Sequence, residues 1–317
     1  NLYLYRKLSM KKLLPFFILF LFNLNYAQEV SQERVTKVLS TLASDEMKGR
    51  EIGTPENDSA AVYIAKLFKE NNLDFCTGDS YLVPFEYKGK VAYNVCGIKK
   101  GKSDKTLAFT AHFDHIGFTN KKGDNVYNGA DDNASGVTTV VGIADYFKEK
   151  KTNFSMMFIA FNGEEKGMKG SKAIAENPAL HSEYQNINAL FNFEMVATVS
   201  QFGPNALFMT GDEFSNLDEL FNANAENGLK IFPDPYKGQQ LFYRSDNVMF
   251  VRKKIIAHSF STVNMNTATH YHQLNDELSV VDFGNVTQII NNLSKTIEKL
   301  KPENFAPKYS ENVNFNK

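Results

Sequence analysis

The sequence is short of cysteine, of excess charge of either sign and of long apolar runs. Its two cysteines, Cys76 and Cys96, cannot build a disulfide framework, and they lack the spacing of a zinc ribbon. Lys and Arg total 35 against 36 for Asp and Glu, which argues against a phosphate-binding surface and hence a nucleic-acid partner. With 43% hydrophobic and 22% charged residues, the composition also excludes bulk disorder and a polytopic membrane protein. A folded enzyme or a binding protein remains.

The first 27 residues differ from the rest of the chain. They hold four basic residues and no acid, and the apolar run Leu13–Leu24 is far shorter than the ~20 residues that span a bilayer as a helix. The small residue Ala27 follows, and the chain then turns polar. This pattern predicts a secretory signal peptide over 1–27, with translation starting at Met10. A membrane anchor and a buried helix are the alternatives.

Export to the periplasm or the medium follows from this prediction, without stable membrane insertion after cleavage. Loss of 1–27 leaves 31 basic and 36 acidic residues, a net charge of −5. In an oxidising compartment Cys76 and Cys96 could form a disulfide, although two buried thiols fit the spacing equally well.

The chain from Ser31 to Leu300 shows one continuous α/β pattern, without linkers or repeats. Short apolar runs separated by helical segments are typical of strands in a largely parallel sheet. The expected strands are Thr106–Thr110, Met156–Phe161, Ala189–Phe193 and Ile255–Phe260, preceded by the pair Tyr81–Tyr87 and Val91–Ile98 around a Lys-Gly turn. The expected helices start near Val35 and at Thr54-Pro55, cover Ala134–Phe147 and close the fold over Phe283–Leu300. Residues 301–317 are polar, and we expect this tail to be loosely held.

Five polar segments interrupt the pattern, mostly where a predicted strand ends. They are HFDHIG at 112–117, YNGADDNASG at 127–136, FNGEEKGMKGS at 161–171, FNFEMV at 191–196 and HYHQLNDE at 270–277. Ligands of open α/β sheets bind beyond the carboxyl ends of the strands, so these segments are expected to meet. Together they supply imidazoles and carboxylates without a thiolate, a donor set that suits zinc or another first-row divalent ion. Carboxylates can also bridge two such ions.

In this order the five segments resemble the zinc-dependent aminopeptidases of peptidase family M28, over nearly all of 31–300. The resemblance implies a three-layer α/β/α fold with a central, mostly parallel mixed sheet, a zinc-dependent exopeptidase fold of the phosphorylase/hydrolase-like type. It implies one catalytic domain over 28–302, followed by the polar tail 303–317. It also implies two Zn²⁺ per chain and peptide substrates. The oligomeric state is left open.

The resemblance also assigns roles to residues. His112, Asp132, Glu165, Glu194 and His272 match the metal ligands, with Asp132 bridging both ions and followed by a cis peptide bond. Glu164 matches the general base for a water that bridges the ions. Asp114 matches the residue that orients His112, and Tyr271 stands where some relatives hydrogen-bond the oxyanion.

One ligand departs from the commoner family pattern. Relatives usually carry Asp where this chain has Glu194, and the longer side chain leaves the affinity and identity of that metal open. Arg244, beside the family-like Ser245-Asp246-Asn247, is a candidate for contact with a substrate carbonyl or carboxylate.

The remaining candidates have simpler interpretations. We expect His115 and His270 to support the ligands or face solvent, His181 to lie on the surface and His258 to lie in the core. Tyr236, Phe242 and Tyr243 are either pocket or core residues.

The sequence therefore predicts an exported aminopeptidase that hydrolyses the N-terminal peptide bond. A single-zinc glutaminyl cyclase, a carboxypeptidase or dipeptidase of the same family, and a non-enzymatic receptor are the alternatives.

Overall fold

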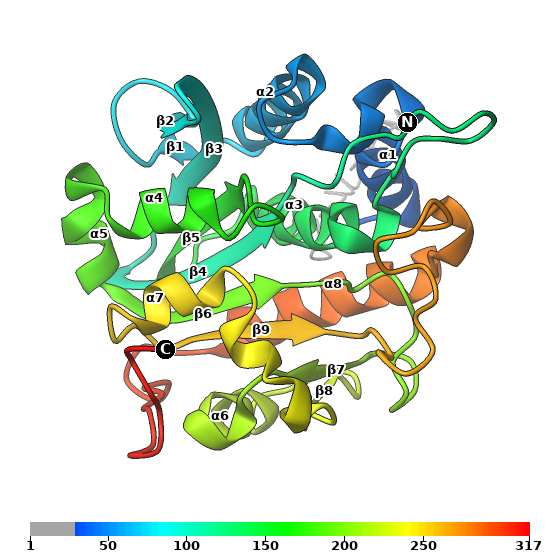
Figure 1. Ribbon diagram of the computed structural model, residues 1–317. Helices are drawn as coiled ribbons and strands as arrows, with labels where there is room; N and C mark the ends of the chain where they lie inside the picture. The colour runs from blue at the N-terminus through cyan, green and yellow to red at the C-terminus, as the bar shows by residue number, and fades with distance from the viewer. Residues whose placement is uncertain (1–28) are drawn as a thin grey trace, which may run out of the picture.

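The computed structural model describes residues 29–317, so the predicted signal peptide and its start at Met10 lie outside the described residues. Figure 1 shows a central sheet covered by helices on both faces. This arrangement confirms the expected three-layer α/β/α fold.

The sheet is mixed, with parallel strands at its centre. Its order is β1-β3-β5-β4-β6-β9-β7-β8, and β2 pairs with β3. Neighbours among β5, β4, β6 and β9 run parallel, whereas β3 pairs with β5 and β7 with β9 antiparallel. The strands are β1 Asp74–Phe75, β2 Leu82–Tyr87, β3 Lys90–Lys99, β4 Ser103–His112, β5 Phe154–Phe161, β6 Ile187–Phe193, β7 Ala206–Met209, β8 Lys230–Pro233 and β9 Ala257–Ser261.

Helices cover both faces of this sheet. They are α1 Gln32–Leu42, α2 Pro55–Glu70, α3 Gly136–Phe147, α4 Lys169–Ala175, α5 His181–Gln185, α6 Leu217–Asn222, α7 Asn247–Val251 and α8 Phe283–Lys299. The apolar faces of α1, α2, α3 and α8 pack with Phe109, Phe158 and Phe191 on one side of the sheet. On the other side, residues of α4, α5 and α7 pack with Ile159 and Leu190. Neighbouring residues of β5 and β6 thus point to opposite cores, which explains their uninterrupted apolar sequences.

Local signals place the main helices as expected. The Thr54 hydroxyl accepts a hydrogen bond from the Asn57 N–H, and Pro55 occupies the first turn of α2. Asp282 caps α8 in the same way, because its carboxylate accepts from the Asn285 N–H. These caps satisfy amides that have no partner within the helix.

Cys76 and Cys96 form a disulfide with their Cα atoms 5.6 Å apart, so the thiol alternative is wrong. The bond ties the segment after β1 to the middle of β3.

The expectation of a loosely held tail over 301–317 is also wrong. Phe305 is buried, and the Tyr309 hydroxyl donates to the Ile255 carbonyl at 2.7 Å and accepts from the Ala257 N–H at 3.0 Å. The tail therefore packs beside β9. Across the described residues, no helix combines the length and apolarity needed to cross a membrane.

Candidate metal centre

The parallel strands bring the predicted ligands to one edge of the sheet. His112 is the last residue of β4, Glu165 lies four residues beyond β5, and Glu194 follows β6 directly. Since β4 lies between β5 and β6 and runs parallel to both, the three side chains emerge side by side. Asp132 reaches them from the wide helical turn before α3, and His272 from the loop between β9 and α8.

The first ligand group consists of His112, Asp132 and Glu194. The Nε2 atom of His112 lies 3.1 Å from Oε1 of Glu194 and 3.3 Å from Oδ1 of Asp132. Its Nδ1 lies 3.0 Å from the backbone carbonyl of Asp114. Donation from Nδ1–H to that carbonyl leaves the lone pair of Nε2 facing the two carboxylates, the tautomer that a metal ligand needs.

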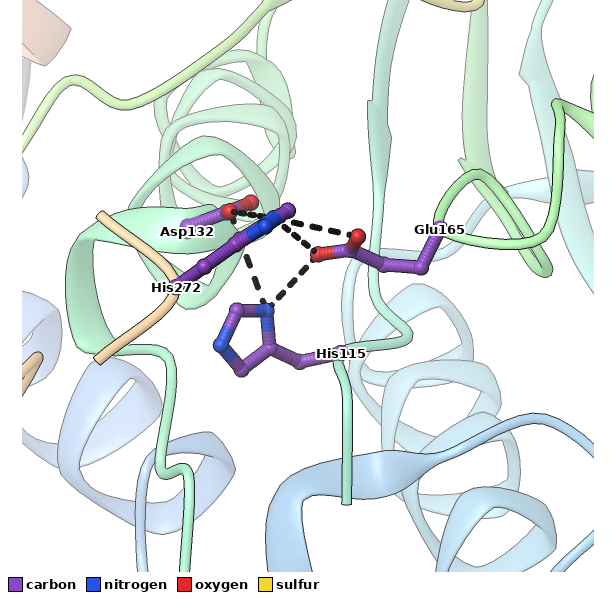
Figure 2. Close-up of side chains that lie close together, drawn as sticks. All are labelled: His115, Asp132, Glu165 and His272. Carbon is purple, nitrogen blue, oxygen red and sulfur yellow. Dashed lines mark hydrogen bonds and ion pairs between the residues drawn. The ribbon is translucent and has the colours of Figure 1, made fainter. Parts of the chain in front are cut away.

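The second group consists of His115, Asp132, Glu165 and His272. Figure 2 shows these four side chains converging on one point. The Nε2 atom of His272 lies 3.2 Å from Oδ2 of Asp132 and 3.1 Å from the Glu165 carboxylate. Asp132 therefore directs one oxygen to each group, as a bridging carboxylate must.

The expected departure at Glu194 is accommodated by a hydrogen bond. Oε2 of Glu194 accepts from the Ser245 hydroxyl at 2.8 Å, and that hydroxyl accepts from the Asn192 side chain at 3.0 Å. The longer side chain thus turns one oxygen toward Ser245 and keeps the other beside His112.

Asp114 orients the site differently from the expectation. Its carboxylate is 3.7 Å from Nδ1 of His112, too far for a hydrogen bond. It accepts instead from the backbone N–H groups of Glu164 and Glu165, at 3.0 and 3.3 Å. The backbone carbonyl of Asp114 holds the imidazole, and the carboxylate holds the acidic pair.

The turn that carries Asp132 is supported by polar residues on both sides. Asp276 accepts from the backbone N–H groups of Asp131 and Asp132, at 2.8 and 3.0 Å. The buried His270 pairs with Asp131 at 2.8 Å, which agrees with its expected supporting role. The peptide bond from Asp132 to Asn133 is cis, as the resemblance implied.

Sequence reasoning missed Arg50, which is fully buried. Its guanidinium donates to the backbone carbonyls of Phe113 and Asn128 at 2.7 Å, of Leu42 at 2.5 Å and of Gly129 at 3.0 Å. It therefore joins the segment just after His112 to the segment just before the turn that carries Asp132. The sequence around Arg50 carries no motif that would reveal this role, because the hydrogen-bond partners of Arg50 are backbone carbonyls, most of them far away in the chain.

The electrostatics of the centre call for a cation. Burial opposes charge on His112, but the carboxylates of Glu194 and Asp132 outweigh it and raise the His112 pKa well above its usual value. Hydrogen bonds with carboxylates raise the pKa of His272 to about 10. Burial raises the pKa of Glu164 well above its usual range. Without a metal the site would hold protons, which a metal would displace on binding.

A cavity of about 610 Å³, including its open mouth, borders the centre. His112, Asp132, Glu164, Glu194 and His272 contribute its polar wall. Its apolar wall consists of Met195, Phe208, Leu241, Val263 and Met265.

Other predicted candidates lie in or near this cavity. Tyr271 lines it with its ring stacked on His272, the ring centroids 4.0 Å apart, and the exposed Arg244 stands at its edge. Tyr236, Phe242 and Tyr243 do not line it. His258 is buried and His181 exposed, as expected.

Comparisons with known proteins agree with this geometry. The family model described as peptidase family M28 matches residues 94–297. The aminopeptidase YwaD of Bacillus subtilis is 30% identical over 115 residues, which cover 35% of this chain and 23% of that relative. The chain matches less than half the length of each curated relative compared.

Two solved structures share the fold. A zinc aminopeptidase from Bacillus subtilis has a TM-score of 0.68 at 17% identity, covering 86% of this chain and 96% of that one. A glutaminyl cyclase from Bacteroides thetaiotaomicron has a TM-score of 0.69 at 16% identity, covering 86% and 99%.

The family match takes in well over half of the chain and includes all five segments from which the centre is built. Together with two ligand groups that share Asp132, it establishes that this chain belongs to peptidase family M28.

Proposed function

We propose that this protein is an exported aminopeptidase that uses two zinc ions to hydrolyse the N-terminal bond of peptides. The observation that carries the proposal is the pair of ligand groups sharing Asp132 beside one cavity. The relatives named as aminopeptidases support it.

The residues present fit zinc. They offer imidazole nitrogens and carboxylate oxygens, which are ordinary zinc ligands, in two groups whose ligand atoms all lie within 4.8 Å of one another. When bound, two such ions would polarise the substrate carbonyl and lower the pKa of the attacking water toward ~7.

Glu164 is the residue placed to move protons. Its backbone N–H is held by Asp114, its side chain lines the cavity, and burial raises its pKa. A carboxylate with a raised pKa is a stronger base, and once protonated it is a suitable acid near neutral pH. Glu164 accepts a proton from the attacking water and returns it to the leaving amine. Tyr271, which lines the cavity beside His272, donates to the developing oxyanion.

The walls of the cavity favour an N-terminal residue with an apolar side chain. Five apolar side chains, among them Phe208 and Leu241, surround the space next to the ligand groups. The carboxylates of Glu164 and Glu194, which also line the cavity, suit a positively charged α-amino group. A carboxypeptidase would need cations there, and among the described residues Arg244 is the one Lys or Arg that lines this cavity.

The similarity to a glutaminyl cyclase keeps single-zinc transamidation as the alternative. The first ligand group argues against it. His112, Asp132 and Glu194 are all present and mutually close, so the chain has ligands for a second ion.

Export is supported by the Cys76–Cys96 disulfide, because such bonds persist in oxidising compartments. The basic and apolar segment 1–27 supports it from the sequence.

The test combines zinc analysis with hydrolysis of leucyl, aspartyl and N-acetyl-leucyl amides of one chromophore. We expect about two zinc ions per chain and rapid cleavage of the leucyl substrate alone. Glu164→Gln should keep its zinc and lose at least 100-fold in kcat, whereas the exposed Glu176→Gln should retain full activity. One zinc per chain together with cyclisation of N-terminal glutamine would favour the glutaminyl cyclase alternative over this proposal. A fully active Glu164→Gln variant would refute the role of Glu164 as the general base.

A further inference from the structure

His115 lies closer to the metal centre than a supporting residue needs to. It is fully buried on the loop after β4. Gly129 packs directly against its ring, because a Cβ atom at Gly129 would lie 2.7 Å from the ring atoms Cδ2 and Cγ. Within 29–317, the buried Nε2 atom of His115 has no hydrogen-bond partner. The polar contacts of this imidazole are therefore all made by Nδ1.

Nδ1 of His115 points at the atoms of the second ligand group, as Figure 2 shows. It lies 2.9 Å from Oε1 of Glu165 and 3.8 Å from Oδ2 of Asp132. On the other side, Nε2 of His272 lies 3.2 Å from Oδ2 of Asp132 and 3.1 Å from Glu165.

These distances match those of a tetrahedral zinc site. With zinc bonds of about 2.0 to 2.1 Å, ligand atoms at the corners of a tetrahedron are about 3.3 to 3.4 Å apart. The four separations, from 2.9 to 3.8 Å, lie on both sides of this value. The group thus offers four donors, two imidazoles and two carboxylates, around one point.

The two ligand groups also differ in their access to the cavity. All three members of the first group line it, whereas His115 and Glu165 of the second group do not. The second group is therefore partly behind the cavity wall.

We propose that His115 is the fourth protein ligand of the metal held by Asp132, Glu165 and His272. This inference rests on the proposed two-zinc function. A neutral imidazole adds no charge, so it completes the coordination without disturbing the charge balance of the carboxylates. The second group then offers four protein donors and the first group three. Zinc can take a fifth ligand, so four protein donors at the second site would still leave it able to bind the attacking water. Because it has one donor more than the first site, we expect the second site to bind zinc more tightly.

The competing role for His115 is a hydrogen bond from Nδ1–H to Glu165, which would make it a positioning residue only. The variant His115→Asn separates the two roles. The amide nitrogen of asparagine can take the place of Nδ1 and donate to Glu165, but an amide is a poor zinc ligand.

The first experiment counts imidazoles by zinc X-ray absorption. In Glu194→Ala the competing first group is incomplete, and one equivalent of zinc then occupies the second. We expect two imidazole nitrogens on this zinc in Glu194→Ala and one in Glu194→Ala/His115→Asn. One imidazole in both proteins overturns the proposal.

The second experiment titrates the tighter zinc site of the otherwise unchanged protein against a chelator of known affinity. We expect His115→Asn to weaken this site at least 100-fold, beyond the about 10- to 100-fold typical of residues that only support a ligand. His181→Asn, an exposed histidine, should change nothing. An unchanged zinc affinity in His115→Asn overturns the proposal. Urea unfolding of chelator-treated samples is the control that each variant is folded.

These results are independent of the proposed activity. Two imidazoles on the zinc of a protein that cleaves no aminoacyl substrate would uphold this inference and refute the proposed function. One imidazole on the zinc of an active aminopeptidase would refute this inference and uphold the proposed function.

Discussion

Replacing Arg50 by methionine should destabilise the whole protein while keeping most of the side-chain volume. The guanidinium makes four hydrogen bonds to backbone carbonyls, and it is fully buried. A buried acceptor left without a partner costs about 1 to 3 kcal/mol. Four such acceptors at the lower end amount to about 4 kcal/mol, and we take the lower end because removing a buried charge relieves its desolvation.

That loss is large against the 5 to 15 kcal/mol typical of a folded domain. Urea unfolding of chelator-treated protein measures it without a contribution from bound metal. We expect Arg50→Met to lower the free energy of unfolding by about 4 kcal/mol, and the exposed Arg244→Met to change it by less than about 0.5 kcal/mol.

Arg50→Lys should fall between Arg50→Met and the wild type, because one ammonium cannot reach all four carbonyls. An Arg50→Met protein that unfolds within 1 kcal/mol of the wild type would refute the assigned role of this residue.

Three further predictions concern pH, the disulfide and Glu194. Burial lowers the pKa of His258 to about 4, so its contribution to stability is complete above pH 6.5 and is lost as the pH falls toward 4. His258→Asn should reduce the loss of unfolding free energy between pH 7 and pH 4 by about 3 kcal/mol, measured in urea, and equal losses in both proteins would contradict this. Cys76→Ser/Cys96→Ser opens a loop with a sequence separation of 20 and should cost about 3 kcal/mol, whereas an unchanged midpoint would deny the cross-link a stabilising role. Ser245→Ala removes the hydrogen bond to Oε2 of Glu194 and should weaken binding of the more loosely bound zinc about 10- to 100-fold. Dialysis followed by zinc analysis would detect this loss. Full retention of that zinc would show that Ser245 does not hold Glu194 in place.

The fold could be predicted where the sequence pattern was local and strong. The apolar runs of β4, β5 and β6 were predicted as strands, with the C-terminal ends of β5 and β6 correct, although each strand begins earlier than predicted and β4 continues two residues further, to His112. The Thr54-Pro55 pair gave the correct start of α2. Short strands escaped prediction, since β7 and β8 have four residues each and are held by pairing with distant partners.

The C-terminal tail over 301–317 shows the same limit of prediction from the sequence. A polar composition suggested a loose segment, yet two aromatic side chains, Phe305 and Tyr309, anchor it beside β9. Burial of a few large rings outweighs many exposed polar residues, because the hydrophobic contribution follows the apolar area removed from water.

The sequence by itself determined the kinds of donor atom and the strand ends that carry them. Imidazoles and carboxylates without a thiolate indicated zinc, and their order along the chain indicated the family. Only the tertiary structure decided which donors share a point in space. It placed His115 beside Glu165 while His270 pairs with Asp131, it held Glu194 through Ser245, and it joined two loops through Arg50. The physical reason is that a metal site depends on separations of a few ångströms between residues far apart in the chain. Those separations are set by sheet register and by backbone hydrogen bonds, which leave no periodic trace in the sequence.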